Sequence, residues 1–412
     1  MKKLTESIES KHFFSFMVSM FLFGSALGLF NGVFNNYLAE VLLIDRFERG
    51  VVEFLRELPG FFLFLLLIPF YRSSETRIIQ IAFLISLAGL AGLAAKSDLR
   101  YLSIFFVVMW STGEHMIMPL RQSIAMHSAK PGREGFALGL SAGAKNFGQV
   151  TGYYLVPLCF IAGAKIIKFQ HSHIFRFVFF LSAFSLVLAL ISTLRLEKSD
   201  KKVKRQKIYF HKKFTKYYIL QTFFGARKQV FLTFAPYVLI LKYGARTELI
   251  AMLYGIYSTL NIFFNPLVGR LIDRFGYKLI LILDSIVLFT VCIVYGFTHL
   301  FFSAGTAFGI ICAVFVIDAM LFAVSMARTV YVGSLSDSRE EASATISTGI
   351  SLDHLFSIII ALLGGLLWEK IGMELLFSVA AFFAVGSFFF SMSLEKPLKK
   401  GSVIQQRPPV RS

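Results

Sequence analysis

Ionisable and amide side chains interrupt the long apolar segments of this sequence, and their types could bind a polar solute. An arginine, lysine or aspartate at the middle of a membrane helix costs roughly 2.5–3.5 kcal/mol if it faces lipid. We therefore expect these side chains to face the protein interior. The candidates for solute binding are Asn31, Asn35, Lys145, Asn146, Gln221, Arg227 and Lys228.

The three cations in this set are the best candidates for holding an anionic solute. Arg227 can grip a carboxylate or phosphate through two parallel hydrogen bonds, whereas Lys145 and Lys228 act as point charges. The same cations could instead only neutralise intramembrane acids, and the amides could only bond neighbouring helices. Arg121 and Arg328 lie near the ends of their apolar segments, where we expect them to pair with acids in loops.

A second set of residues has the types required for ion coupling or gating. Its members are Glu53, Arg56, Glu57, Glu114, His115, Asp318, Asp353 and His354. Glu53, Arg56 and Glu57 stand at i, i+3 and i+4, so they share one helical face and Arg56 can pair with either carboxylate. A structural clasp and a proton-linked switch both fit this pattern. Glu114 and Asp318 lie at similar depths in their segments, where a carboxylate suits coupling to a proton gradient.

The histidines give no separate signal for catalysis or metal binding. Adjacent helical residues point about 100° apart, so His115 and His354 are not expected to bond the acids beside them. His171 and His173 fall in a predicted loop and could bind a metal, but a solvated loop is the simpler interpretation. The three cysteines lie in apolar segments without disulfide or metal spacing. We expect no metal site and no cofactor.

The composition indicates a protein that crosses a membrane many times. Of the 412 residues, 56% are hydrophobic and 16% are charged, which leaves too few polar residues to cover a soluble domain. The net charge of +18 could indicate nucleic-acid binding. However, the basic residues gather in connections on one side of the predicted membrane, so they indicate orientation and contact with lipid instead.

We predict an all-α polytopic membrane protein with twelve transmembrane helices, since each apolar segment can cross about 30 Å of hydrocarbon. The segments are 13–38, 50–71, 78–95, 101–126, 135–161, 174–194, 217–241, 249–268, 279–297, 304–327, 344–368 and 375–392. The excess of Lys and Arg in the even-numbered connections predicts cytoplasmic termini. The expected units are a six-helix bundle (1–194), a basic cytoplasmic linker (195–213), a second six-helix bundle (214–394) and a disordered basic cytoplasmic tail (395–412).

The two predicted halves repeat weakly. Arg133 and Gly143, at the start of the fifth segment, recur as Arg339 and Gly349 half a chain later, at the start of the eleventh. Such repeats are typical of transporters in which two pseudo-symmetric bundles enclose a solute path.

The connection between the eighth and ninth segments carries the sharpest motif, Gly269-Arg-Leu-Ile-Asp273-Arg274-Phe-Gly276-Tyr-Lys278. The pattern G-x-x-x-D-R-x-G-x-K resembles the cytoplasmic hairpin signature of the major facilitator superfamily. A small Gly269 permits close approach of helices, Asp273 can bond a helix end, and Gly276 supplies a turn. The resemblance implies two six-helix bundles, transport by alternating access, and a hairpin that helps to lock the cytoplasmic face.

The sequence departs from the family pattern at two places. The matching first-half segment, residues 69–77, lacks the Gly-x-x-x-Asp core, so half of the lock is absent or Glu75 partly replaces it. The fifth segment keeps the glycines of drug–proton antiporters but has Gln149 where their proline stands, and it adds Lys145. The glutamine and the added lysine in the fifth segment both count against multidrug efflux.

We therefore predict a secondary active transporter and not an enzyme. It is expected to move a small polar, anionic solute by alternating access, with H+ as the candidate coupling ion, as a monomer in the plasma (inner) membrane. The alternative is a drug or lipophile exporter of the same fold. A non-transporting membrane sensor or enzyme is a remoter alternative, because the sequence contains neither a clustered His/Asp motif nor a signalling domain.

Overall fold

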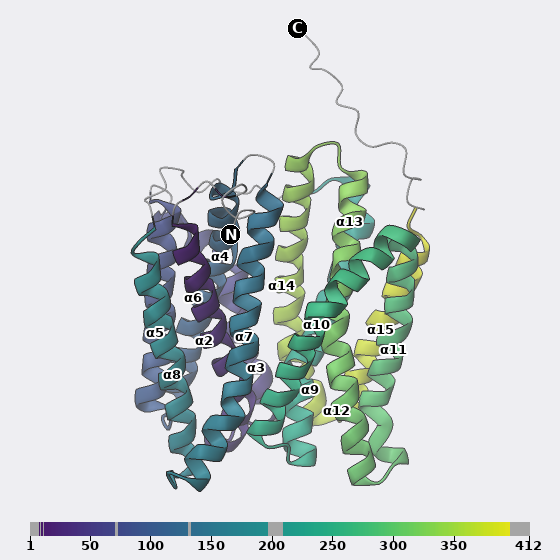
Figure 1. Cartoon of the computed structure of the whole chain (residues 1–412). Coiled ribbons are helices and arrows are strands. Elements are labelled where there is room, and N and C mark those ends of the chain that lie inside the picture. The colour runs from purple at the N-terminus through teal and green to yellow at the C-terminus, as the bar shows by residue number, and fades with distance from the viewer. Residues whose placement is uncertain are drawn as a thin grey trace.

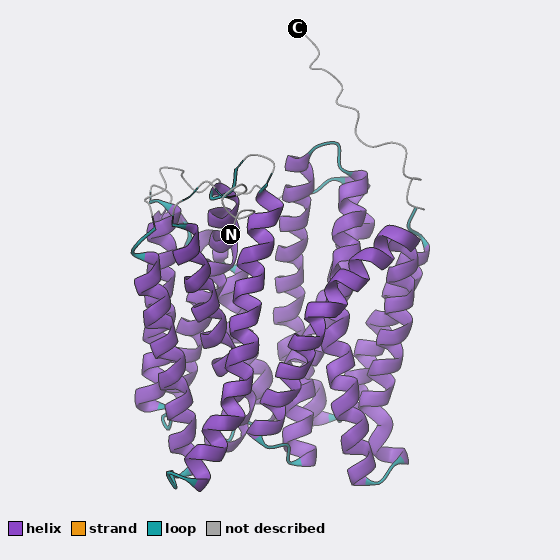
Figure 2. Cartoon of the chain, in the orientation of Figure 1, coloured by secondary structure: helices purple, strands orange, loops and turns teal. Residues whose placement is uncertain are grey.

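The computed structural model describes residues 8, 10, 12–70, 73–130, 133–196 and 209–395. Helices account for nearly all of this part of the chain (Figure 2), and an isolated β-bridge joins Ile8 to Ala129. Most of the predicted basic linker and all but the first residue of the predicted tail lie outside the described residues.

The first half of the chain forms a bundle of six spans (Figure 1). These are α2 Phe13–Asn36 with the π-helical turn η1 Tyr37–Val41, α3 Arg46–Phe61 continued by α4 Leu63–Leu66 and η2 Ile68–Phe70, α5 Glu75–Lys96, α6 Arg100–His127, α7 Glu134–Lys165 and α8 His171–Thr193. Helix α2 packs against α7 and α8, and α5 packs against α6 and α8.

The second half forms a matching bundle of six spans (Figure 1). After the short η3 Lys212–Phe214 these are α9 Thr215–Tyr243, α10 Thr247–Phe275, α11 Tyr277–Phe301, α12 Ala304–Leu321 continued by η4 Phe322–Val324 and α13 Ser325–Leu335, α14 Arg339–Lys370 and α15 Met373–Met392. The repeat seen in the sequence is visible in α7 and α14, which both have 32 residues. We call the end of the molecule where α2 begins and α15 ends the termini side.

The twelve predicted spans are present, and they differ in polarity. Within the described residues, nine helices are long and apolar enough to cross a membrane by length and composition. The remaining three spans are built on α3, α6 and α9, which carry charged side chains in their membrane portions. Such spans are tolerated where their polar faces are covered by other helices or by water.

The second span begins four residues earlier than predicted. The Asp45 side chain accepts a hydrogen bond from the Glu48 backbone at 2.8 Å, and the Glu48 side chain accepts one from the Asp45 backbone at 3.0 Å. This reciprocal capping box fixes the start of α3 at Arg46. Arg49 therefore lies inside the helix, where it is buried.

The hairpin motif is more helical than predicted. Helix α10 continues through Gly269 and Asp273 to Phe275, and Gly276 is the single residue between α10 and α11. Gly276 has φ 82°, a conformation that favours glycine. Lys278 donates a hydrogen bond of 2.7 Å to the carbonyl of Leu394, two residues beyond the end of α15.

Two expectations for this motif are wrong in the conformation described. A Cβ at Gly269 would have no atom within 4 Å, so no helix approaches it closely. Asp273 is exposed, and the hydrogen bonds and ion pairs found among the described residues do not include it. Gly269 and Asp273 therefore do not hold this face closed here. The corresponding first-half segment contains residues 71 and 72, which are outside the described residues.

The glycines of the fifth span serve close packing of α7 against α2. A Cβ at Gly148 would overlap the Phe21 carbonyl oxygen, and one at Gly152 would overlap the Ser25 carbonyl oxygen. Gly143, one turn closer to the termini side, would meet nothing within 4 Å. Helix contact thus explains Gly148 and Gly152 but not Gly143.

This difference predicts opposite effects for two otherwise identical substitutions. We expect Gly148→Ala to lower the stability of the purified protein by about 1–3 kcal/mol, because the added methyl group overpacks the α2–α7 contact. Gly143→Ala is the matched control and should raise stability by up to about 1 kcal/mol, because alanine is the better helix former. Thermal unfolding in detergent measures both, and equal effects would contradict the packing.

Candidate functional site

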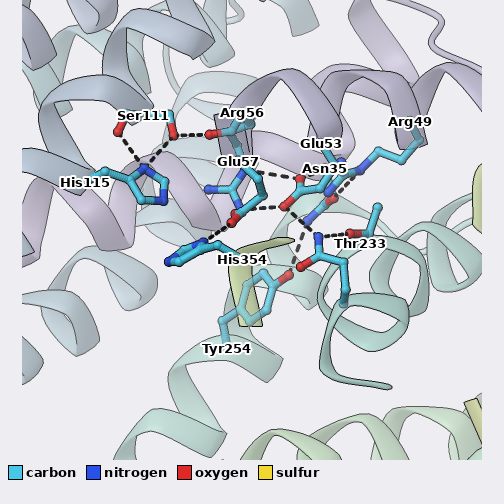
Figure 3. Close-up of polar contacts among 11 residues, drawn as sticks. Asn35, Arg49, Glu53, Arg56, Glu57, Ser111, His115, Thr233, Tyr254 and His354 are labelled. Carbon is cyan, nitrogen blue, oxygen red and sulfur yellow. Dashed lines mark hydrogen bonds and ion pairs between the residues drawn. The ribbon is translucent and has the colours of Figure 1, made fainter. Parts of the chain in front are cut away.

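A polar network centred on Glu53 lies between the two bundles (Figure 3). Glu53 is 1% exposed. Its Oε2 accepts hydrogen bonds from Arg49 at 2.8 Å and from Arg56 Nε at 3.1 Å. Its Oε1 accepts from Arg56 Nη2 at 2.5 Å and from Gln229 at 3.2 Å. Because Gln229 belongs to α9, this carboxylate joins the second span to the second bundle.

The network extends through Arg49 to a second contact between the bundles. Arg49 Nε donates to Asn35 Oδ1 at 3.2 Å, and the Asn35 amide donates to the Tyr254 hydroxyl on α10 at 3.2 Å. The neighbouring Asn36 donates to the Ala245 carbonyl at 2.9 Å. Of the two predicted asparagines in α2, Asn35 is therefore part of this network. Asn31 is half-buried and has no hydrogen bond among those of the described side chains.

Glu57 connects the network to two histidines (Figure 3). Its Oε1 accepts from Arg56 Nη2 at 3.1 Å, and its Oε2 lies 3.0 Å from Nδ1 of His354 on α14. The His354 ring packs edge-on against the His115 ring of α6, with centroids 5.4 Å apart. His115 Nδ1 lies 2.8 Å from the Ser111 carbonyl oxygen. Each histidine thus finds its partners away from the acid beside it in the sequence.

Two of the cations predicted for solute binding are bonded to acids of their own bundle. Arg227 and Asp318 form an ion pair in which both side chains are buried. Lys228 Nζ lies 2.5 Å from Asp353 Oδ2. These contacts favour charge neutralisation, the alternative that the sequence left open, for Arg227 and Lys228.

Lys145 has no such acid. Its Nζ donates to Gln149 at 3.2 Å, and the Gln149 amide donates to the Tyr153 hydroxyl at 2.8 Å. The Tyr153 ring stacks on Tyr254 of α10, with centroids 5.4 Å apart. Since these three residues of α7 follow one another at i+4, the row beginning at Lys145 lies on the face of α7 that meets the second bundle. Asn146, one position on, is exposed and outside this row.

Arg328 is the second cation without a bonded carboxylate. It is 4% exposed, its Nε donates to Gln221 at 3.2 Å, and its guanidinium lies 3.7 Å from the centre of the Phe224 ring. Its Nη2 is buried without a hydrogen-bond partner among the described residues. The expected pairing of Arg328 and Arg121 with loop acids is therefore wrong. No ion pair of the described residues includes Arg121 either, although it interacts electrostatically with Glu114.

Three buried carboxylates also lack a full set of partners. Within the described part of the chain, Glu114 Oε2, Asp284 Oδ1 and Asp353 Oδ1 are buried and have no hydrogen-bond donor. Glu114 was predicted as a coupling residue. Asp284, on α11, interacts electrostatically with Arg227 and Arg328, and nothing local in the sequence links it to these two residues.

The contacts between the bundles are unevenly distributed along the spans. The inter-bundle polar contacts described above lie near the middle of the spans or in the half away from the termini side. A further inter-bundle hydrogen bond of 2.6 Å runs from the Tyr237 hydroxyl to the Ile44 carbonyl, in the half away from the termini side. Toward the termini side, Gly139 and Gly143 on α7 and Gly333 on α13 would each accept a Cβ with no atom within 4 Å. The hydrogen bonds described between the bundles therefore lie near the middle of the spans and on the side away from the termini.

Comparison with known proteins agrees with this architecture. The family model described as Major Facilitator Superfamily matches residues 13–352 and 217–411. This chain belongs to the major facilitator superfamily. The resemblance inferred from the hairpin motif is thus confirmed, as are the all-α fold with two six-helix bundles and the expectation of a transporter of small molecules instead of an enzyme.

Solved structures of this superfamily share the fold at low sequence identity. The nucleoside transporter NupG is 13% identical with a TM-score of 0.72, and the match covers 93% of this chain and 99% of that one. A D-xylose-proton symporter is 15% identical with a TM-score of 0.67, covering 95% and 99%. A bacterial homologue of the human lysosomal transporter Spinster, inward-facing and unoccupied, is 16% identical with a TM-score of 0.62, covering 93% and 96%. A search of curated proteins finds no match.

Proposed function

We propose that this superfamily member moves a small organic anion across the membrane by alternating access. The observation that carries the proposal is the position of Lys145, which faces the second bundle and bonds only an amide. Arg227 and Lys228 already bond carboxylates. A cation in this position is offset most simply by a negative charge on the solute.

The second bundle offers a complementary group. Gln221 holds the Arg328 guanidinium through Nε, while the buried Nη2 retains unused hydrogen-bonding capacity. A guanidinium with free donors suits carboxylate or phosphate oxygens. We propose that Lys145 binds the solute from the first bundle and that Arg328 binds it from the second bundle.

The excess of basic residues on the termini side supports cytoplasmic termini in the plasma (inner) membrane. With that orientation, the hydrogen bonds between the bundles lie toward the outside, and we infer that the conformation described is the one open toward the cytoplasm. Transport then requires the contacts at Glu53, Asn35 and Tyr254 to break while the termini side closes. We propose that a single copy of the chain completes this cycle.

Solute binding is tested by thermal unfolding of the purified protein with a panel of compounds. We expect organic carboxylates or phosphate esters to raise the melting temperature, and neutral sugars and nucleosides to leave it unchanged. Lys145→Gln should weaken anion binding about tenfold or more, which corresponds to about 1.4 kcal/mol or more. Lys165→Gln, an exposed lysine at the far end of the same helix, is the matched control.

Stabilisation by neutral sugars or nucleosides alone would overturn the anionic assignment. Stabilisation by lipophilic drugs alone would favour the exporter alternative. Anion binding that is unchanged in Lys145→Gln would remove Lys145 from the site.

Coupling to protons is proposed for Glu114, because its Oε2 is buried without a donor and can accept a proton without breaking a bond. In reconstituted vesicles, uptake by the native protein should depend on a pH gradient, and Glu114→Gln should abolish that dependence. Glu340→Gln, which changes an exposed acid at the start of α14, should retain it. Gradient-dependent uptake that persists in Glu114→Gln would refute this assignment.

A further inference from the structure

We infer that Glu57, His115 and His354 form a Zn2+ site that joins the two bundles. One ligand atom from each of these residues lies within 4.8 Å of the others. Two imidazoles and a carboxylate are a ligand set that zinc adopts in proteins with a fourth position left open. The residues come from α3, α6 and α14, so they are far apart in the sequence.

Two of the three ligands, His115 and Glu57, are already oriented by a second contact. His115 Nδ1 lies 2.8 Å from the Ser111 carbonyl, to which it can donate, and this tautomer leaves Nε2 free to bind a metal. The Ser111 hydroxyl in turn donates to the Arg56 carbonyl at 2.5 Å. Arg56 bonds Glu57 Oε1 and leaves Oε2 directed to His354 (Figure 3). Outer contacts of this kind fix the orientation of metal ligands.

A glycine provides the space between the rings. A Cβ at Gly60 would lie 2.7 Å from His115 Nε2 and 3.0 Å from His354 Cε1. A larger residue would therefore fill the region into which both imidazoles project. His354 is only half-buried, whereas Glu57 and His115 are buried, so the ion would arrive from the His354 side.

Zinc would draw the three groups together. Ligand atoms around a tetrahedral zinc lie about 3.3 Å apart, given zinc–nitrogen distances of about 2.0–2.1 Å. Glu57 Oε2 and His354 Nδ1 are already 3.0 Å apart, and one ligand atom from each of the three residues lies within 4.8 Å of the others. Because α3 and α6 belong to one bundle and α14 to the other, the bound ion holds the bundles in the conformation described. We expect the bound ion to block transport. This consequence rests on the proposed alternating access, whereas zinc binding itself does not.

The test is to titrate the full-length native protein in detergent with Zn2+ alone and to measure binding and thermal unfolding by calorimetry. One site per chain is expected, with a rise in melting temperature. His115→Ala and His354→Ala should each weaken zinc binding tenfold or more. Gly60→Ala should weaken it without removing a ligand, and His173→Ala, at an exposed histidine on α8, should bind zinc as the native protein does.

X-ray absorption of the zinc-loaded native protein keeps the proposal testable if a variant fails to fold. Two imidazoles and one carboxylate are expected around the ion. An all-oxygen shell, native-like binding by His354→Ala, or no binding below millimolar Zn2+ would overturn the site. Because no transported solute is present, these results are independent of whether the chain moves an anion.

Discussion

Glu53→Gln is expected to lower the stability of the protein by about 3–5 kcal/mol. The substitution leaves Arg49 and Arg56 in place without the carboxylate that both of them bond. Arg49 is 1% exposed, so bulk solvent cannot replace the lost partner. Removing one member of a buried ion pair costs this much because the remaining charge is uncompensated. Glutamine keeps the shape of the side chain, so the loss measures charge and hydrogen bonding instead of packing.

Unfolding of the purified variant in detergent measures this loss, with Glu48→Gln as its control. Glu48 lies on the same helix and pairs with Arg100, but both side chains of that pair are more than one third exposed. An exposed pair contributes about 1 kcal/mol or less. If the two variants were equally stable, the network around Glu53 would not be what holds α3 in place.

Asp318→Asn is the second substitution with a large expected effect, again about 3–5 kcal/mol, because it leaves Arg227 buried without its carboxylate. The paired replacement Arg227→Met with Asp318→Leu should restore most of the stability, since an apolar pair of similar size often substitutes for a buried ion pair. Melting temperatures of the single and double variants measure both effects. A single variant as stable as the native protein would contradict the pairing.

The double variant also separates the two roles considered for Arg227. If the arginine only neutralises Asp318, the double variant should bind organic anions as well as the native protein does. If Arg227 holds the solute directly, the double variant should fold and yet lose anion binding. The buried ion pair favours the first result.

The number and course of the spans could be predicted because each span is a long, nearly uninterrupted apolar segment of the sequence. The exception is the start of the second span, α3. The start of α3 carries several charges between Arg46 and Glu57, and charge density alone favours a loop there. The capping pair Asp45 and Glu48 was the available signal, and it places the helix start, and with it Arg49, correctly.

The site could be predicted only where its contacts are local. Arg56 bonds Glu53 and Glu57 within one helix, and their spacing shows it. The bonds from Glu57 to His354 and from Gln229 to Glu53 join residues on different helices, for which a single sequence carries no periodic signal. Tyr254 was missed for the same reason.

The hairpin motif shows a different limit. Its residues indicate the family, yet the close helix approach expected at Gly269 is not made in the conformation described. The conformation described is joined at the other side, so the function of a motif in one state does not predict its contacts in another.

Distances between pairs of spin labels test alternating access most directly. With the three native cysteines replaced, one pair is placed on the termini side at Gly135 and Gly333, which have free space around them. The other is placed on the opposite side at Leu43 and Ile371, which are exposed. We predict that organic anions or a change of pH alter the two distances in opposite directions, the first shortening as the second lengthens. If both distances stayed fixed under every condition, or changed together, the bundles would not alternate and the proposed transport cycle would be contradicted.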